Sequence, residues 1–468
     1  MRRALLPIAA ACALAACQAG VRPALAPQPR RLASPPAITQ LAHPAWTRNA
    51  VIYEVNIRQF TPEGTFAALQ QQLPRLRGLG VDILWLMPVQ PIGTLKRKGV
   101  LGSYYSIADY RGINPEYGTA ADFKALVGEA HRLGMKVILD WVQNHSAWDN
   151  PWITEHPDWY VHRKDGSISV PIVNGKETDW TDVAQLDYAN PALREAMIAA
   201  MRWWVDDMGV DGFRCDHASG EPYDFWQQAT TALRTDRPDL FLLAESEDPK
   251  LQAYFDMTYG WELHHLLNAI AQGKRGTSAL DALLARQDSL FPRNTYRMDF
   301  TSDHDENSWA GTEFERMGAD YAPGFVLDAT LQNSMPLLYT GQEAGLNKRL
   351  RFFEKDTVAW GHPAFADFYR TIFALKHEQP ALANGAAGGP QVKLVTDGGE
   401  RVYAFTRTRG ANTVLVAVNF GDAATTVTYS GLSRPGAYRD WFAPGPPVEL
   451  PPTGKLDIPA HGFRVLVR

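Results

Sequence analysis

Polar side chains follow four separate apolar segments of the sequence. They are Asp140 with Asn144 and His145, Arg214 with Asp216, Glu245, and His304 with Asp305. One carboxylate after a strand is weak evidence of a site, because such residues often cap the next helix. Four clusters from separate segments, combined with an arginine and two histidines, are hard to explain as caps. They predict a single site where carboxylates do chemistry.

Two of these carboxylates suit different roles. Arg214 and Asp216 are two residues apart, so on a strand they share a face, and the guanidinium keeps the carboxylate ionised. Glu245 follows the apolar residues 242–244, a setting that raises the pKa of a carboxyl group toward that of a general acid. A nucleophile and an acid/base roughly 5–5.5 Å apart are what retaining glycoside hydrolysis needs.

The remaining polar residues complete this interpretation. Asp305 is a third carboxylate that would hold sugar hydroxyls and stabilise the positive charge of an oxocarbenium-like transition state. His145 and His304 would donate hydrogen bonds to hydroxyls of the same ring. A metal-dependent hydrolase built on His304, Asp305, His145 and Asp140 is an alternative that the residue types leave open.

Short apolar runs alternate with helical patterns from about residue 50 onward. Strands are predicted at residues 50–57, 81–89, 135–142, 210–216, 240–246, 296–303 and 335–341, and helices at 65–80, 122–134, 190–209 and 224–234. Runs that are apolar on both faces indicate a parallel sheet. About eight such units fit a (β/α)8 TIM barrel, which places polar residues after the strands at one mouth. A doubly wound sheet has the same repetition and is the competing layout.

Two regions depart from this repetition. Residues 146–189 form a long insertion after the third strand, with Trp148, Trp152, Trp159 and Trp180, and a loop of this length is usually functional. Each tryptophan is either a sugar platform or a packing residue of the insertion. Residues 383–468 alternate between apolar and polar positions with turn residues between runs, which predicts a C-terminal all-β sandwich.

The N-terminus has the features of an export signal. Arg2 and Arg3 precede an apolar stretch that is too short to span a bilayer. It ends in Leu-Ala-Ala-Cys, which resembles a bacterial lipoprotein signal cleaved before Cys17, the residue that would carry the lipid. An ordinary secretory signal is the alternative. We expect an exported protein anchored by lipid, and Gln18 favours the outer membrane because inner-membrane retention commonly uses Asp at that position.

These features divide the chain into four parts. Residues 1–16 are the expected signal peptide, and 17–48 are a Pro/Ala-rich tether. Residues 49–382 are the barrel with its insertion at 146–189, and 383–468 are the β domain. Apart from Cys17, the expected site of lipid attachment, the mature chain keeps a single interior cysteine, Cys215, and we therefore expect no intramolecular disulfide.

Composition excludes several classes of protein. The 468 residues are 45% hydrophobic and 21% charged, which is ordinary for globular proteins and argues against collagen-like, coiled-coil or disordered chains. The formal net charge is −5, with no long basic run, which argues against nucleic-acid binding. The sequence gives no indication of a protein partner.

Six segments resemble the α-amylase family of glycoside hydrolases, family 13. They are YYSIADYRGINPEYGT (104–119), DWVQNH (140–145), GFRCD (212–216), LLAE (242–245), FTSDHD (300–305) and GQEAG (341–345). The similarity covers about residues 50–382 in the family's order and spacing. It implies a barrel with a small domain inserted after the third strand and a β-rich domain behind it.

The resemblance also implies residue roles. Asp216 would be the nucleophile, Glu245 the acid/base and Asp305 the stabiliser of the transition state, while Arg214, His145 and His304 would contact the sugar, Tyr105 would stack on it and Asp140 would orient Arg214. The implied substrate is a maltooligosaccharide or another α-glucan, and the chemistry needs no cofactor.

Two departures from the family pattern matter. Calcium-binding members use the residue matching Asn144 together with an Asp near the end of the insertion, where this chain has Gln185. A neutral amide is a weaker ligand than a carboxylate for a hard cation, which counts against a structural calcium site. Many endo-acting amylases have a Lys-His pair shortly after the nucleophile, whereas His217 and residues 218–220 stand here, which weakens the case for cleavage within long starch chains.

Four functions therefore remain open at this point. The first is a retaining α-glucan hydrolase, and the second is a transglycosylase or α-glucoside isomerase that uses the same covalent intermediate. The third is a non-catalytic glycan-binding lipoprotein, against which the presence of all three carboxylates argues. The metal-dependent hydrolase is the fourth.

Overall fold

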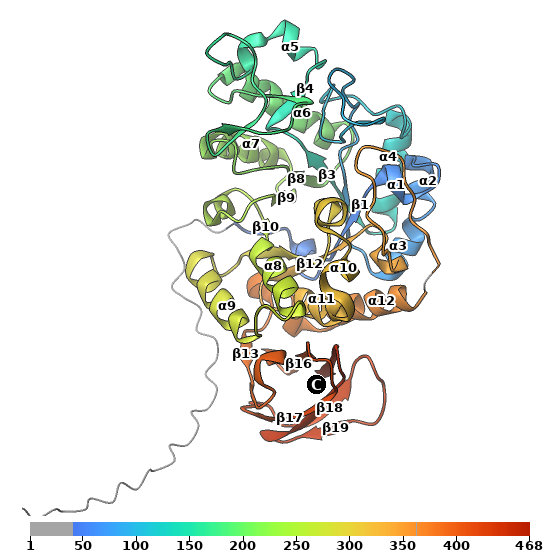
Figure 1. The fold of residues 1–468 in the computed structure, drawn as a ribbon, viewed down its shortest axis with the longest axis vertical. Coiled ribbons are helices and arrows are strands. Elements are labelled where there is room, and N and C mark those ends of the chain that lie inside the picture. Colours follow the sequence, from blue (N-terminus) through green and yellow to red (C-terminus); the bar gives the residue numbers. More distant parts are fainter. Residues whose placement is uncertain (1–40, 362) are drawn as a thin grey trace, which may run out of the picture.

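A closed barrel of eight parallel strands forms the centre of the molecule (Figure 1). The computed structural model describes residues 41–361 and 363–468. In sheet order the barrel strands are β1 (Ile52–Val55), β12 (Ser334–Tyr339), β11 (Tyr296–Asp299), β10 (Met257–Tyr259), β9 (Phe241–Ala244), β8 (Gly212–Cys215), β3 (Lys136–Trp141) and β2 (Ile83–Leu86). Closure confirms the predicted (β/α)8 barrel, because a doubly wound sheet would leave two open edges.

Successive side chains along each strand point alternately into the barrel and out toward the helices. Ile52, Ile83, Ile138, Leu243 and Met298 pack with one another in the barrel interior. Their strand neighbours, such as Tyr53 and Leu84, belong to the larger cluster between the barrel and its helices. Toward the carboxyl ends of the strands, the inward positions are occupied by polar residues. The alternation that places apolar side chains in the core therefore also directs these polar side chains into the mouth of the barrel.

Helices surround the barrel and return the chain from one strand to the next. They are α1 (Ile57–Phe60), α2 (Phe66–Gln70), α3 (Leu73–Leu79), α4 (Ala120–Arg132), α6 (Pro191–Asp206), α7 (Tyr223–Asp236), α8 (Trp261–Ala271), α9 (Ser278–Leu290), α10 (Glu313–Met317), α11 (Tyr321–Thr330) and α12 (Pro363–Glu378). Thr119 caps α4 in a capping box with Asp122, which satisfies its first free N–H groups. Among the described residues, no helix combines the length and apolar character needed to cross a membrane.

One predicted helix differs from the structure, and one strand was not predicted. The helix expected at residues 65–80 is two helices, α2 and α3, separated at Gln71–Gln72. Pro74 near the start of α3 lacks an N–H and is tolerated only in a first helical turn, so one continuous helix cannot form there. The sequence interpretation also missed β10, a strand of three residues that is too short to give a periodic signal.

The insertion and the C-terminal region lie at opposite ends of the molecule (Figure 1). The insertion contains α5 (Trp152–Glu155), the strand pair β4 (His145–Ala147) and β7 (Val183–Gln185), and the hairpin β5 (Ile172–Val173) and β6 (Lys176–Glu177). The insertion follows β3 directly, and the β4–β7 pair at its base begins with the site candidate His145.

The C-terminal region is all β, as predicted. One sheet has six strands in the order β13 (Gln391–Lys393), β15 (Val402–Arg409), β16 (Asn412–Asn419), β21 (Gly462–Val467), β18 (Gly436–Asp440) and β19 (Val448–Leu450). A second sheet has β14 (Val395–Thr396), β17 (Thr425–Ser430) and β20 (Thr453–Ile458). Helix α11 contacts β16 and β21, so this region supports the barrel from outside the mouth.

The predicted export features lie almost wholly outside the described residues. The expected signal peptide, Cys17 and most of the tether belong to residues 1–40. The first element of the described chain is a short helical turn at Ala45–Thr47.

Candidate active site

Four barrel strands bring the predicted polar residues together. Asp140 lies at the end of β3, Arg214 lies in β8 with Asp216 just beyond it, and Glu245 directly follows β9. Asp305 follows β11 after a short loop. Each of these residues occupies an inward position or the loop that leaves one, so the side chains converge on the mouth of the barrel.

Arg214 is the centre of this cluster and is fully buried. Its Nη1 donates to Asp140 Oδ1 at 3.0 Å and to Asp216 Oδ1 at 2.8 Å. Its Nη2 lies 2.8 Å from Glu245 Oε1 as an ion pair, and its Nε donates to Tyr259 OH at 3.0 Å. One guanidinium therefore holds three carboxylates in fixed relation to one another.

Gly212 explains how Arg214 reaches this position. A Cβ atom at Gly212 would lie 1.8 Å from the carbonyl oxygen of Phe241. Only glycine allows strand β8 to approach β9 so closely. The close approach brings the side chain of Arg214 beside that of Glu245, which leaves β9.

The two carboxylates on Arg214 have opposite pKa shifts. Burial opposes ionisation of Asp216, but the positive charge of Arg214 and its hydrogen bond to the carboxylate outweigh burial and place the pKa of Asp216 below its usual value. Burial, together with the negative charges of Asp216 and Asp305, raises the pKa of Glu245 to about 8 against the attraction of Arg214. At neutral pH the pair therefore holds one ionised carboxylate and one protonated carboxyl group.

His217 adds a main-chain contact to Glu245. It has a φ of +42°, in the left-handed region that non-glycine residues rarely adopt. In this conformation its N–H donates to Glu245 Oε2 at 2.7 Å. The main-chain N–H directly after Asp216, the candidate nucleophile, therefore holds Oε2 of Glu245, the candidate acid.

His304 belongs to a chain of buried hydrogen bonds that runs to Asp140. Its Nδ1 pairs with Glu54 Oε1 at 2.6 Å and its Nε2 with Tyr105 OH at 2.8 Å, and Tyr105 OH in turn donates to Asp140 Oδ2 at 3.0 Å. Burial disfavours the imidazolium, but Asp305 and Glu54 outweigh it and hold the pKa of His304 well above its usual value. The ring carries a positive charge under the open side of the cluster.

Asp140 is the shared acceptor of this network. It is fully buried and also accepts from Trp85 Nε1 at 3.0 Å. Burial raises its pKa to about 6 against the attraction of Arg214. With its oxygens committed to protein donors, Asp140 orients Arg214 and Tyr105 rather than facing the opening.

Asp305 and Tyr105 face the opening to different degrees. The Asp305 side chain is 42% exposed, and its Oδ2 lies 3.5 Å from His304 Nε2. The Tyr105 ring stacks against His304 with 5.4 Å between ring centroids. An accessible carboxylate thus lies beside a fixed aromatic face, an arrangement suited to a sugar ring.

The four tryptophans of the insertion lie in different surroundings. Trp152 stacks on Tyr110 and packs edge-on against Trp159, so this pair holds the insertion together. Trp148 donates to the carbonyl of Thr181 at 3.0 Å. Trp180 alone lies beside the site residues, with 5.8 Å between its ring and that of His145 and 6.1 Å to that of His217.

His145 and Cys215 are both buried beside Asp216. Burial lowers the pKa of His145 although Asp216 attracts a proton toward it, so its imidazole is neutral at pH 7. Burial raises the pKa of the Cys215 thiol well above its ordinary value, which leaves the thiol unreactive. The side chain of Cys215 packs on the outer face of β8.

Three site residues were missed by the sequence interpretation. Glu54 and Trp85 lie in predicted strands, and Tyr259 lies in the missed strand β10. Glu54 had a detectable signal, because a carboxylate at an inward position within an apolar strand needs a buried partner. Tyr259 had no such signal.

The residues that a structural calcium site would use make contacts within the protein. The Oε1 atom of Gln185 accepts the N–H of Ile172 at 3.0 Å, so the one carbonyl that could replace a carboxylate is engaged. The amide nitrogen of Asn144 lies 3.4 Å from His145 Nδ1. In the described part of the chain, no three His, Cys, Asp or Glu side chains converge in a way that could hold a metal ion.

Two known families match the chain. Residues 46–360 match the family described as "Alpha amylase, catalytic domain". Residues 394–445 match the family described as "Alpha amylase, C-terminal all-beta domain". The first match alone covers more than half of the chain.

Curated relatives include both hydrolases and transferases. Alpha-amylase MalA of Haloarcula japonica is 32% identical over 410 residues, which are 82% of this chain and 57% of that protein. Alpha-amylase 2 of Dictyoglomus thermophilum is 24% identical over 87% of this chain and 75% of its own length. The alpha-1,4-glucan:maltose-1-phosphate maltosyltransferase of Rhodospirillum rubrum is 33% identical over 46% of this chain and 33% of its own length. The chain thus spans little more than half the length of MalA.

Solved structures are similar over nearly the whole described chain. An alpha-amylase of Lactobacillus plantarum is 34% identical with a TM-score of 0.81, covering 90% of this chain and 99% of that one. The maltogenic alpha-amylase AmyB of Thermotoga neapolitana is 30% identical with the same TM-score, covering 90% and 98%.

Proposed function

The chain belongs to the alpha-amylase family, whose enzymes act on glycosidic bonds, and from this premise we propose that it is a retaining α-glycoside hydrolase. Its proposed substrates are maltooligosaccharides or starch-like α-glucans. The relatives named alpha-amylase support this substrate class.

In the proposed first step, Glu245 is the acid and Asp216 the nucleophile. Protonated Glu245 gives its proton to the glycosidic oxygen as the bond from that oxygen to the anomeric carbon breaks. An Asp216 oxygen forms a new bond to the same carbon, which gives a covalent glycosyl–Asp216 ester. The exposed carboxylate of Asp305 and the ionised Asp216 stabilise the positive charge that develops on the sugar ring.

In the second step, Glu245 acts as the base. Its carboxylate, now ionised, takes a proton from a water molecule, and the water oxygen attacks the anomeric carbon. The ester bond to Asp216 breaks, the sugar leaves with its original configuration, and Glu245 is protonated again. Two successive displacements at the anomeric carbon, each with inversion, explain why the product retains the configuration of the substrate.

The observation that carries the proposal is the contact of one guanidinium with both carboxylates. Arg214 lies 2.8 Å from Asp216 Oδ1 and 2.8 Å from Glu245 Oε1. This arrangement suits the short carboxylate separation of retaining enzymes better than the wider separation, about 6.5–9.5 Å, that leaves room for water in inverting enzymes. The opposite pKa shifts of Asp216 and Glu245 supply the two protonation states that the first step needs.

Transglycosylation is the second candidate, and the maltosyltransferase relative favours it. Both reactions share the covalent intermediate and differ only in whether water or a sugar hydroxyl attacks it. Incubation with maltoheptaose, followed by chromatography over time, tests the choice. Hydrolysis gives only products shorter than the substrate, whereas products longer than maltoheptaose would contradict a simple hydrolase. An Asp216→Asn variant provides the blank.

The proposal includes export and a lipid anchor. The leader and Cys17 belong to the undescribed residues, and the N-terminal motif alone supports this part. Metabolic labelling with palmitate, compared with a Cys17→Ser variant, tests it. Label present in the parent and absent from the variant is the expected result; label absent from both would overturn the anchor.

A further inference from the structure

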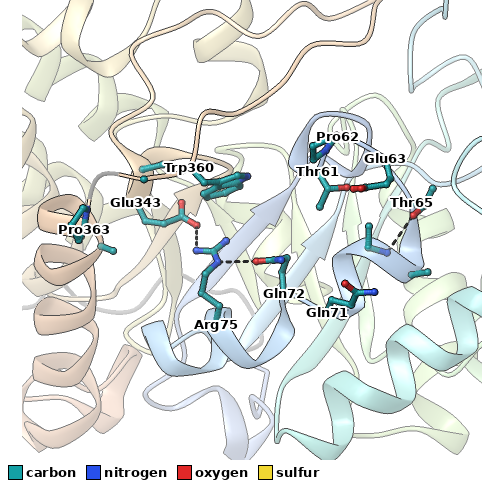
Figure 2. A pocket seen from close by; sticks show the side chains of 15 residues that line it. Thr61, Pro62, Glu63, Thr65, Gln71, Gln72, Arg75, Glu343, Trp360 and Pro363 are labelled. Atoms are coloured by element: carbon teal, nitrogen blue, oxygen red, sulfur yellow. Dashed lines mark hydrogen bonds and ion pairs between the residues drawn. The ribbon is translucent and has the colours of Figure 1, made fainter.

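A second pocket lies outside the barrel, beside the break between α2 and α3 (Figure 2). Its volume is about 740 Å³, within the roughly 300–1,000 Å³ range of ligand pockets. Trp360, Arg75, Glu343, Gln71 and Gln72 line it, with none of the catalytic candidates among the lining residues. We call it the Trp360 pocket.

The strand β1 separates this pocket from the catalytic mouth. Tyr53 points outward and donates to Glu343 Oε1 at 2.7 Å, at the floor of the Trp360 pocket. Its neighbour Glu54 points inward and pairs with His304. Successive strand residues face opposite sides, so the two sites lie on opposite sides of the barrel wall.

Trp360 offers a rigid and partly exposed aromatic face. Its Nε1 donates to the carbonyl of Phe60 at 3.0 Å, which fixes the ring, and its exposed fraction is 37%. The guanidinium of Arg75 lies 4.4 Å from the indole centre, and Phe60 lies 4.9 Å from it. The guanidinium carbon of Arg75 also lies 5.7 Å from the centre of the Phe60 ring, so Arg75 and Phe60 pack against each other as well as against the partly exposed indole.

The charges in the pocket compensate one another. Arg75 Nη1 donates to Glu343 Oε1 at 3.0 Å, and Arg75 Nε donates to Gln72 Oε1 at 3.3 Å, as Figure 2 shows. Glu343 is 2% exposed and neutralises the arginine. A phosphate or carboxylate ligand would have to compete with this buried carboxylate, which counts against an anion. Exposed Gln71 and Glu63 provide hydrogen-bonding groups at the rim.

We propose that the Trp360 pocket binds a short segment of a neutral oligosaccharide through stacking on Trp360 and hydrogen bonds from the rim. A flat aromatic face, planar amides and balanced charge are the groups that recognise a polyhydroxylated ring without ionic groups. The choice of an α-glucan among such ligands rests on the proposed function. The pocket would hold a long glucan chain on the enzyme while another part of the chain occupies the mouth.

Retardation in native gels that contain glycogen tests this site. All proteins carry Asp216→Asn so that the polysaccharide is not digested. Trp360→Ala is expected to raise the dissociation constant for glycogen about tenfold, whereas Trp360→Phe, which keeps an aromatic face, retains most of the affinity. Val448→Ala, at an exposed position of the C-terminal sheet, is the matched control and is expected to behave as the parent.

A second variant and a second readout separate the pocket from the mouth. Gln71→Ala changes only an exposed rim residue, so it preserves folding, and it is expected to weaken glycogen binding severalfold. With Asp216 intact, Trp360→Ala is expected to cleave maltotriose at the parent rate. Equal retardation of the parent, Trp360→Ala and Gln71→Ala would overturn the site. A different result separates the two proposals: Trp360→Ala and Gln71→Ala lose retardation, but the parent with Asp216 intact cleaves no α-glucan. That result would overturn the proposed function and would still support oligosaccharide binding at the Trp360 pocket.

Discussion

The main-chain N–H of His217 donates a hydrogen bond of 2.7 Å to Oε2 of Glu245. His217 makes this contact from a left-handed backbone conformation, with a φ of +42°, directly after the proposed nucleophile. The bond favours the ionised form of Glu245 and therefore limits how far burial raises its pKa. A strained residue thus links the positions of the two catalytic candidates.

The conformation of His217 is expected to set the alkaline limit of activity. In His217→Val a β-branched side chain disfavours positive φ, so the N–H turns away and the pKa of Glu245 rises further. We expect kcat to fall about tenfold or more and the alkaline limb of the pH–rate profile to move upward. His217→Gly accepts the same φ and is the control, with an unchanged alkaline limb. Equal profiles for the two variants would rule out this role.

Glu245→Gln is expected to change how stability depends on pH. The pKa of Glu245 is about 8 in the folded state, above its ordinary value of 4.5, so folding favours the protonated form. The parent therefore loses stability as pH rises from about 4.5 to about 8, and glutamine removes this loss. A shift of one pKa unit corresponds to about 1.4 kcal/mol, so we expect the variant to gain about 5 kcal/mol relative to the parent across this range. Melting temperatures at both ends of the range measure it; a constant difference would contradict the assignment.

Glu54→Gln is expected to weaken catalysis although Glu54 lies beneath the opening. Removing its charge lowers the pKa of His304, because Glu54 is one of the three carboxylates, with Asp305 and Asp303, that outweigh the burial of that imidazole. The imidazole of His304 then loses its proton at a lower pH, and its hydrogen bond to Tyr105 is no longer made by a charged ring. We expect kcat/KM to fall about 10–100-fold, with a larger loss at higher pH. A loss that is the same at every pH would point to a purely structural effect.

Calcium removal is expected to leave the protein unchanged. Gln185 Oε1 is engaged by the N–H of Ile172, and a neutral amide stands where a carboxylate ligand would be needed. We expect chelation to change neither the melting temperature nor the rate of maltoheptaose cleavage. A drop in melting temperature that added calcium reverses would contradict this expectation. A Gln185→Asp variant is the informative comparison, since any calcium response should appear there first.

The large features of the fold follow from the sequence because they rest on periodicity. Apolar runs such as residues 135–142 and 210–216 mark strands buried on both faces, and the closed barrel confirms them. The strand β10, Met257–Tyr259, escaped prediction because three residues carry no period. The break at Gln71–Gln72 escaped because the apolar spacing continues across it while Pro74 ends the helix.

The residue types of the site could be predicted from the sequence, but the contacts between these residues could not. The motif around Arg214 and Asp216 and the apolar approach to Glu245 place the carboxylates at one mouth. The contribution of Tyr259 to Arg214 depends on a strand that the sequence does not reveal, and the left-handed turn at His217 depends on local packing. Such relations arise from tertiary contacts between distant segments, which residue spacing does not encode.

Mass spectrometry of a trapped intermediate tests whether Asp216 is the nucleophile. In Glu245→Gln, α-maltosyl fluoride can still react with Asp216, because fluoride leaves without a proton, while the base for the second step is missing. We expect the protein to gain the mass of one maltosyl group, located on the peptide that contains Asp216, and to gain no mass when Asp216→Asn is added. An unmodified protein, or a label on another residue, would contradict this assignment.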